Sequence, residues 1–265
     1  MGWDLGLDAV ERGTRFGVNF DGDEFDFVSK GARQSLVRLQ PGEYRTKIEG
    51  NFNRIRRLNG KDGEYWEITN KRGVRFWFGT DDSSREEEGL HVFRWALDRI
   101  EDSNGNFVRF TYTKDRQQLY LDPVEYSGSD YGIPPDKCVL FRWEAVPVDV
   151  PEMFNTGFEV ETAKRLKIVD VGIPITGECS DNGPLSLIRR YELSYETSSV
   201  TDREGYRANF NQNFVVLRNG LFHVHDLDNL RESVSRIGGG FHWRSPATPT
   251  WTLDRMCDRP SMACD

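Results

Sequence analysis

Residues 92–113 read VFRWALDRIEDSNGNFVRFTYT, two aromatic-rich segments joined by Asn104-Gly105. Asn-Gly is the strongest short-range marker of a β-hairpin, because both residues accept the positive φ that a tight reversal requires. The second segment alternates in the way a strand with one buried face does, the residues of that face being Val108, Phe110 and Tyr112. This stretch therefore predicts an antiparallel hairpin.

The same pattern occurs at 65–79, YWEITNKRGVRFWFG, where Gly73 lies at the break. Apolar alternation predicts further strands at 25–28, 44–48, 118–126, 138–146, 165–173 and 186–196. We expect residues 80–89 to form a solvated charged loop and residues 159–166 to form the one short helix. The predicted fold class is all-β, with repeated antiparallel hairpins forming a curved sheet and an irregular C-terminal tail.

The pattern loosens after residue 197. Short apolar runs at 214–217 and 220–227 are followed by Gly238-Gly239-Gly240, and 244–265 shows little periodicity. We expect a β domain over 1–197 and a divergent tail over 198–265, either docked irregularly or partly disordered.

Charge and hydropathy exclude several classes of protein. The net charge of −8 argues against nucleic-acid binding, which requires a positive stripe. The nearest basic run is Arg54–Arg57, which is typical of arginines on a solvated strand face. No segment approaches the roughly 18 consecutive apolar residues that indicate a membrane-spanning helix. The start of the chain shows no classical signal peptide, which predicts a protein that is cytoplasmic as synthesised.

The cysteines are sparse and irregularly spaced for a disulfide scaffold, at positions Cys138, Cys179, Cys257 and Cys264. This spacing favours free thiols. A bridge between Cys257 and Cys264 is the alternative that the spacing leaves open.

Two groups of side chains have the chemistry of a metal site. His223 and His225 share one side of a predicted strand, close in sequence to His242. The acidic run Asp21–Asp26 offers oxygen ligands for calcium, although it lacks the glycine and terminal glutamate of an EF-hand loop. Surface histidines and a solvated acidic segment explain both groups more simply, so we predict no metal, no cofactor and no catalytic residues. No nucleophile elbow, phosphate-binding loop or zinc-protease motif occurs, and we expect a non-enzymatic protein.

Over residues 1–196 the chain resembles the SpvB-type virulence proteins, which are related to the B component of the tripartite Tc insecticidal toxins and to RHS-repeat proteins. The segments that carry the resemblance, in order along the chain, are Gly2-Trp3-Asp4-Leu5-Gly6-Leu7, Tyr65-Trp66-Glu67-Ile68-Thr69, Trp95-Ala96-Leu97, Ile100-Glu101-Asp102, Asn104-Gly105-Asn106 and Arg190-Tyr191-Glu192-Leu193-Ser194-Tyr195. The resemblance is not recognisable over 198–265. The ADP-ribosyltransferase domain of some relatives has no counterpart in this sequence.

The resemblance implies a structural, non-catalytic module that contributes to a β shell enclosing or delivering a toxic polypeptide. It implies protein partners, namely other toxin-complex components or shell segments, and an extracellular location as part of such a complex. Since the family pattern is lost after 197, open sheet edges are expected to allow self-association. The alternative is a carbohydrate- or host-surface-binding β module that uses exposed aromatic side chains.

Overall fold

The computed structural model describes residues 5–146, 150–177, 179–180 and 183–195. In this part of the chain all regular structure is β, apart from one short 3₁₀ turn, η1 (Asp82–Ser84). Every strand pairing is antiparallel, so the predicted all-β class is confirmed. Among the described residues no helix has the length and apolar character needed to cross a bilayer.

The first half of the chain contributes nine strands. They are β1 (Ala9–Arg12), β2 (Phe25–Ser29), β3 (Ala32–Gln40), β4 (Glu43–Thr46), β5 (Arg54–Gly60), β6 (Gly63–Thr69), β7 (Arg75–Phe78), β8 (Arg85–Glu88) and β9 (His91–Glu101). The second half contributes seven more. They are β10 (Asn106–Asp115), β11 (Gln118–Ser129), β12 (Lys137–Ala145), β13 (Glu152–Met153), β14 (Val160–Glu161), β15 (Lys164–Pro174) and β16 (Leu185–Glu192).

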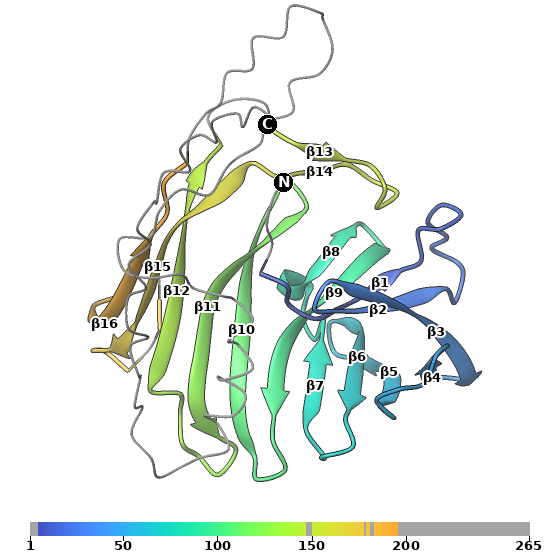
Figure 1. Cartoon of the computed structure of the whole chain (residues 1–265), viewed down its shortest axis with the longest axis horizontal. Helices are drawn as coiled ribbons and strands as arrows, with labels where there is room; N and C mark the ends of the chain where they lie inside the picture. The colour runs from blue at the N-terminus through green and yellow to red at the C-terminus, as the bar shows by residue number, and fades with distance from the viewer. Residues whose placement is uncertain (1–4, 147–149, 178, 181–182, 196–265) are drawn as a thin grey trace, which may run out of the picture.

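Eight strands close on themselves. They follow the order β1-β2-β3-β4-β5-β6-β7-β9, and β9 pairs with β1 to complete the ring, which we call the barrel (Figure 1). The sequence predicted a curved sheet only, and that prediction was wrong for this half of the molecule. Local alternation specifies strands and faces but not whether the first and last strands of a sheet meet.

Two long strands make the closure possible because each pairs with different neighbours along its length. In β3, residues 32–35 pair with β2 and residues 36–40 pair with β4. In β9, residues 94–96 pair with β1, whereas residues 97–101 pair with β7. Each of these strands therefore joins two parts of the barrel wall, one through each half of its length.

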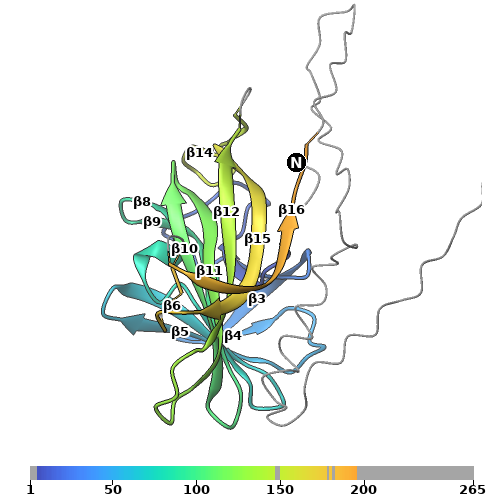
Figure 2. The ribbon, with the colours of Figure 1, turned by 90° about the vertical axis from the view of Figure 1, so that its left-hand side faces the viewer.

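The sheet then continues beyond the barrel. Starting from the C-terminal half of β9, it extends through β10, β11, β12, β15 and β16, which lie side by side in Figure 2. We call these five strands the open sheet. Within the described residues β16 pairs with β15 alone, so the open sheet ends on a free edge. Here the predicted curved antiparallel sheet is confirmed.

Four large aromatic side chains fill the barrel. Phe25 lies 4.9 Å from Trp66 and 5.8 Å from Trp95 and from Tyr44, measured between ring centroids, and all three contacts are edge-on. Trp66 and Trp95 are almost completely buried. Each ring of this size buries a large apolar area, so the barrel has a dense core despite the low aliphatic content of the chain. Apolar side chains of the open sheet join the same core, among them Val108, Phe110, Tyr112, Leu121 and Leu166.

The two hairpin turns predicted from the sequence have the same construction. In the β9–β10 turn the Asp102 side chain accepts hydrogen bonds from the backbone N–H groups of Asn104 and Asn106, and Gly105 has a φ of 78°. In the β6–β7 turn Asn70 and Gly73 have the corresponding roles, with a φ of 80° at the glycine. The predicted reversals are confirmed, and an Asx side chain with a positive-φ glycine explains both.

Residues 80–89 were expected to be a solvated loop, and that expectation was wrong. They form η1 and β8, and β8 pairs with β9. Glu86 is buried in β8, 3.6 Å from Arg94, which also lies 3.5 Å from Glu11. Burial raises the pKa of Glu86, and Arg94 opposes that shift. The charged residues of 80–89 predicted a solvated loop, but a charged side chain can be buried where it is paired with an opposite charge, as Glu86 is with Arg94.

The helix expected at 159–166 is also absent. This segment contains β14 and the start of β15. β14 pairs with β13 in a small separate hairpin, whose Phe158 and Val160 form a second apolar cluster with Phe93 of β9. Tertiary packing of these apolar side chains decides the local structure of a short segment with no strong propensity.

Candidate functional site

The outer face of the sheet carries a continuous row of directly opposed residues. It runs from the barrel into the open sheet, one residue per strand. In order across β4, β5, β6, β7, β9, β10, β11 and β12 these residues are Glu43, Arg56, Glu67, Trp77, Arg99, Arg109, Glu125 and Cys138. Alternation explains the row, because the neighbours of these residues point into the core.

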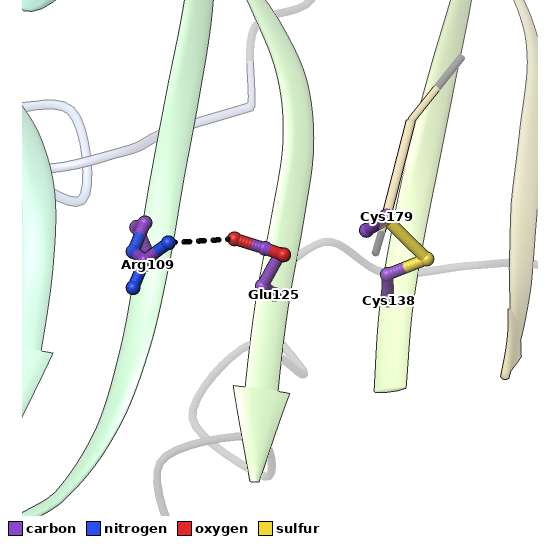
Figure 3. The surroundings of a disulfide bond; sticks show 4 residues. All are labelled: Arg109, Glu125, Cys138 and Cys179. Carbon is purple, nitrogen blue, oxygen red and sulfur yellow. Dashed lines mark hydrogen bonds and ion pairs between the residues drawn. A yellow bond between two sulfur atoms is a disulfide. The ribbon is translucent and has the colours of Figure 1, made fainter. Parts of the chain in front are cut away.

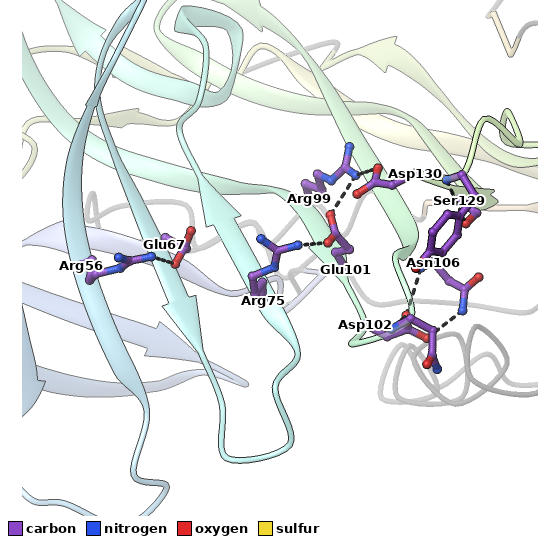
Figure 4. A network of polar contacts seen from close by, with 11 residues as sticks. Arg56, Glu67, Arg75, Arg99, Glu101, Asp102, Asn106, Ser129 and Asp130 are labelled. Atoms are coloured by element: carbon purple, nitrogen blue, oxygen red, sulfur yellow. Dashed lines mark hydrogen bonds and ion pairs between the residues drawn. The ribbon is translucent and has the colours of Figure 1, made fainter.

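Most charges on this face are paired across strands, as Figure 4 shows. Arg75 and Arg99 both contact Glu101, and Arg99 also contacts Asp130. Arg109 lies 3.2 Å from Glu125 on the next strand (Figure 3). Opposite charges facing each other across strands stabilise the pairing and its register.

Guanidinium groups also lie over the aromatic rings of this face. The Arg75 guanidinium is 4.9 Å from the ring centre of Trp77, and that of Arg99 is 5.7 Å away. Arg99 also lies 4.3 Å from the ring centre of Phe107. Phe107 faces Gly128 of β11, where a Cβ atom would come within 2.5 Å of the phenylalanine ring. The glycine therefore makes room for the ring across the strand pair.

A cleft of about 600 Å³ opens beside this network. Its walls come from β6, β7, β9, β10 and the segment that follows β7, and the polar side chains that line it include Asp81, Asp98, Arg99 and Thr111. A second hollow of about 590 Å³ shares Arg109 and Asp130 with the first. The two therefore adjoin and form one groove along the outer face of β9, β10 and β11.

Asp98 is the unusual residue of this cleft. It is 5% exposed and lies where the β7–β9 pairing shifts register, between the opposed pairs Phe78–Leu97 and Trp77–Arg99. Its Oδ2 atom accepts hydrogen bonds from the Thr80 backbone N–H at 2.5 Å and from the Ser84 hydroxyl at 3.2 Å.

The Oδ1 atom of Asp98 is buried and has no hydrogen-bond partner among the described residues. Burial raises the pKa of the Asp98 carboxyl above its usual range, against the hydrogen bonds from Thr80 and Ser84. A register shift of this kind re-aims a side chain, and such shifts are common next to functional sites.

The acidic run named in the sequence analysis lies elsewhere, on the barrel. Asp23 accepts a hydrogen bond from the Tyr44 hydroxyl at 3.1 Å and contacts Arg38, while Asp26 contacts Arg33. In the described part of the chain no group of three or more His, Cys, Asp or Glu side chains is placed to hold a metal ion. His223 and His225 lie outside the described residues.

The basic run Arg54–Arg57 forms the start of β5, as interpreted from the sequence. Its arginines contact acidic groups of neighbouring strands and of the β1–β2 loop: Arg54 with Glu43, Arg56 with Glu67, and Arg57 with Glu64 and Asp23. These ion pairs leave no positive stripe at β5 of the kind that nucleic-acid binding needs.

The expectation of free thiols was wrong for two of the four cysteines. Cys138 of β12 and Cys179 of the β15–β16 connection form a disulfide with a Cα–Cα distance of 6.1 Å (Figure 3). The two residues are 41 positions apart, and only the folded sheet brings them together. Cys257 and Cys264 lie outside the described residues.

Neither Asp98 nor the cleft was predicted from the sequence. One signal was present: the bulky apolar residues Phe93, Trp95 and Leu97 of β9 occupy odd positions and Ile100 an even one, although Val92 and Ala96 weaken the alternation. A change of phase within one strand indicates an inserted residue, and Asp98 lies at that change. The other walls of the cleft come from strands that the sequence does not place together.

Comparison with known families finds a match for the N-terminal part of the chain. The family model described as Salmonella virulence plasmid 65kDa B protein, SpvB, matches residues 1–129. The resemblance to SpvB-type proteins stated from the sequence is thereby confirmed over these residues. A comparison with curated protein sequences finds no match.

Solved structures share the fold. The N-terminal domain of the effector protein SpvB from Salmonella typhimurium strain LT2 matches with a TM-score of 0.61 at 16% identity, covering 74% of this chain and 84% of that one. The TcdB2-TccC3 structure matches with a TM-score of 0.61 at 18% identity, covering 75% of this chain. The Tc holotoxin pore of Photorhabdus luminescens matches with a TM-score of 0.62 at 19% identity, again over 75% of this chain. The matches cover only 13% and 12% of those two Tc chains.

Proposed function

We propose that residues 1–197 form a structural, non-catalytic module of an RHS/Tc-type toxin complex. The module contributes to the β shell that encloses or delivers a toxic polypeptide. Its partners are other toxin-complex components or shell segments, and its place of action is extracellular, as part of such a complex. The family match over 1–129 and the shared fold support this proposal.

The observation that carries the proposal is the open sheet, whose last strand, β16, pairs with β15 alone among the described residues. A shell must be extended strand by strand, and a closed barrel alone offers no edge for another strand. In β16 the side chains of Leu187 and Ile188 are 48% and 62% exposed. These exposed apolar groups at the last strand of the open sheet suit the addition of a strand from a neighbouring shell segment.

Non-catalytic action fits the chemistry of the outer face. The arginines of the cleft are engaged by Glu101, Asp130 and Glu125, and hydrogen bonds from Thr80 and Ser84 hold one oxygen of Asp98. Such pairing fixes the surface rather than activating a nucleophile.

The test is to search the neighbouring reading frames for an RHS-repeat protein and to co-express the protein found there with the full chain. We expect the two to co-elute in size-exclusion chromatography and to form hollow particles in electron micrographs. The double variant Leu187→Lys/Ile188→Lys should abolish co-elution, because two charges would be placed along the β16 edge.

The matched control is Met153→Lys, which adds a charge at an exposed apolar position of β13, away from the open edge. This variant should co-elute like the parent chain. A chain that never co-elutes with the RHS-repeat protein, or an edge variant that co-elutes as well as the parent, would contradict the proposal.

The alternative function is carbohydrate or host-surface binding. The half-buried Trp77 in the cleft favours it, because an indole ring beside polar groups is a common platform for sugars. However, the guanidinium groups of Arg75 and Arg99 already lie over that ring. A glycan array with the full chain and with Trp77→Ala decides the matter: sugar binding that is lost in the variant would favour this alternative.

A further inference from the structure

The cleft beside Trp77 contains an unbalanced pair of carboxylates. Its arginines all have acidic partners among the described residues, with Glu101, Asp130 or Glu125. Asp81 and Asp98 lie in the same lining, and neither forms an ion pair with a Lys, Arg or His of the described residues. The cleft lining therefore contains two carboxyl groups that no cation of the described residues pairs with.

Asp98 adds an unmet hydrogen-bonding capacity. Its side chain is buried in the wall, and the Oδ1 atom has no donor among the described residues. A buried carboxylate oxygen without a donor is unfavourable, since it has lost water and gained no replacement. A ligand that brings a donor and a positive charge into the cleft removes both the unmet hydrogen bond and the charge imbalance.

We propose that this cleft binds a lysine or arginine side chain of an extended partner polypeptide, with Asp98 and Asp81 as its acceptors. Ammonium and guanidinium groups carry only donors, so they match a wall that offers only acceptors. The inference rests on the proposed function for one point, namely that the partner is a polypeptide of the toxin complex.

The adjoining hollow gives the partner chain room to continue. It shares Arg109 and Asp130 with the cleft, and its other lining residues include Phe107, Ile133 and Pro134. The exposed side chain of Ile133 makes that end apolar. The groove thus fits a basic residue followed at a short distance by an apolar one.

The protonation of Asp98 provides a direct readout of occupancy. Burial keeps the pKa of Asp98 raised in the empty cleft, and a cation bound next to the carboxyl must lower that pKa. Diffuse attraction of a basic peptide to the acidic surface would leave the titration of this carboxyl unchanged.

The experiment measures binding of hexalysine to the full chain by calorimetry, with hexaglutamate as the probe of opposite charge. We expect hexalysine to bind, and Asp98→Asn to weaken its affinity about tenfold or more, the loss of one charge-assisted hydrogen bond. Asparagine keeps an oxygen that accepts from the Thr80 N–H, so this variant should fold. Asp21→Asn is the matched control: it removes the same charge at an exposed position of the barrel and should change the affinity less than about twofold.

NMR titration of the Asp98 carboxyl in the parent chain, with and without hexalysine, needs no variant. A fall of its pKa with the peptide supports the site. An unchanged Asp98 titration, or equal weakening by Asp98→Asn and Asp21→Asn, overturns the inference. Co-elution with the RHS-repeat protein is measured separately, so the inference can fail while the proposed function stands.

Discussion

The barrel and the open sheet differ in whether their outermost strands are paired. In the barrel, β9 returns to β1, and a core of rings including Phe25, Trp66 and Trp95 fills the interior. The open sheet has no such closure within the described residues and ends at β16. In addition to apolar packing, its strands are joined by a disulfide and by a buried carboxylate that accepts hydrogen bonds from two arginines.

That carboxylate belongs to Asp170 of β15. It accepts hydrogen bonds from Arg142 of β12 at 3.1 Å and from Arg190 of β16 at 2.6 and 2.8 Å. One acidic side chain therefore ties together three strands. The comparison teaches that apolar packing extends through both halves, whereas the strands of the half that does not close are also joined by a disulfide and by ionic hydrogen bonds.

The largest effect is expected in the barrel core. Trp66→Ala removes a fully buried ring and should lower the free energy of unfolding by about 3–5 kcal/mol, through lost burial and the cavity left behind. Thermal or urea unfolding monitored by circular dichroism measures it. Trp143→Ala in the open sheet removes a half-buried ring of the same type and should cost clearly less. Equal losses would mean that the two halves do not differ in the way proposed.

The second-largest loss of stability is expected on removal of the disulfide, and it should be confined to the open sheet. Cys179→Ser, or reduction of Cys138–Cys179, should destabilise the β12, β15 and β16 region by about 2–4 kcal/mol, because the unfolded chain regains the freedom of a 41-residue separation. Hydrogen exchange measured by mass spectrometry should show faster exchange in β15 and β16. Unchanged exchange there, or faster exchange in β2 and β6, would break the distinction between the two halves.

Asp170→Asn should have the third-largest effect. It should lower the free energy of unfolding by about 1.5–3 kcal/mol, because the charge-assisted hydrogen bonds from two arginines are weakened. The same exchange experiment should locate the loss in β12, β15 and β16. Arg38→Gln serves as control, because its ion pair with Asp23 is exposed on both sides and should contribute little.

A pH series extends this prediction. As the pH falls, the contribution of Asp170 in the open sheet to stability should decrease, whereas that of Asp98 in the barrel should increase. Hydrogen bonds from Arg190, and then from Arg142, lower the pKa of Asp170 in the folded chain despite its burial, so its stabilisation is present above about pH 4 and is lost as the pH falls through the folded pKa. Burial raises the pKa of Asp98, so that its contribution to stability increases as the pH falls towards about 4. Asp98→Asn should remove the second trend and leave the first.

The β9–β10 turn joins the two halves, and Gly105→Val tests it. Valine resists the φ of 78° found there, and we expect a loss of about 1–3 kcal/mol. Gly73→Val, in the matching turn within the barrel, should cost a similar amount. A Gly105 variant that melts within about a degree of the parent would show that the turn tolerates a side chain, contrary to this prediction.

The smallest effect concerns the free edge. The exposed apolar groups of β16 should cause concentration-dependent self-association, strengthened when salt screens the net charge of −8. Leu187→Lys/Ile188→Lys should suppress it. Sedimentation at several concentrations in moderate salt measures both chains. A parent chain that stays monomeric from low to high micromolar would indicate that the edge is already covered.

The sequence by itself determined most of the local structure of this protein, although not that of residues 80–89 and 159–166. Period-two alternation and the Asn70–Gly73 and Asp102–Gly105 turns specified the strands, their inner faces and the hairpin reversals. These features depend on residues a few positions apart, where φ preferences and side-chain alternation act directly. The order of motifs also sufficed to indicate the SpvB resemblance.

The tertiary structure alone decided closure, bracing and the cleft. The β1–β9 pairing joins residues more than 80 positions apart, and the Cys138–Cys179 bridge and the Asp170 contacts likewise depend on which strands become neighbours. The charge of the buried Glu86 is compensated by Arg94, which the fold brings to it from the neighbouring strand. Asp98 could be seen as part of a cleft only after β7 and β10 flanked β9. Such contacts follow from the packing of the whole chain, and alternation within a single strand does not encode them.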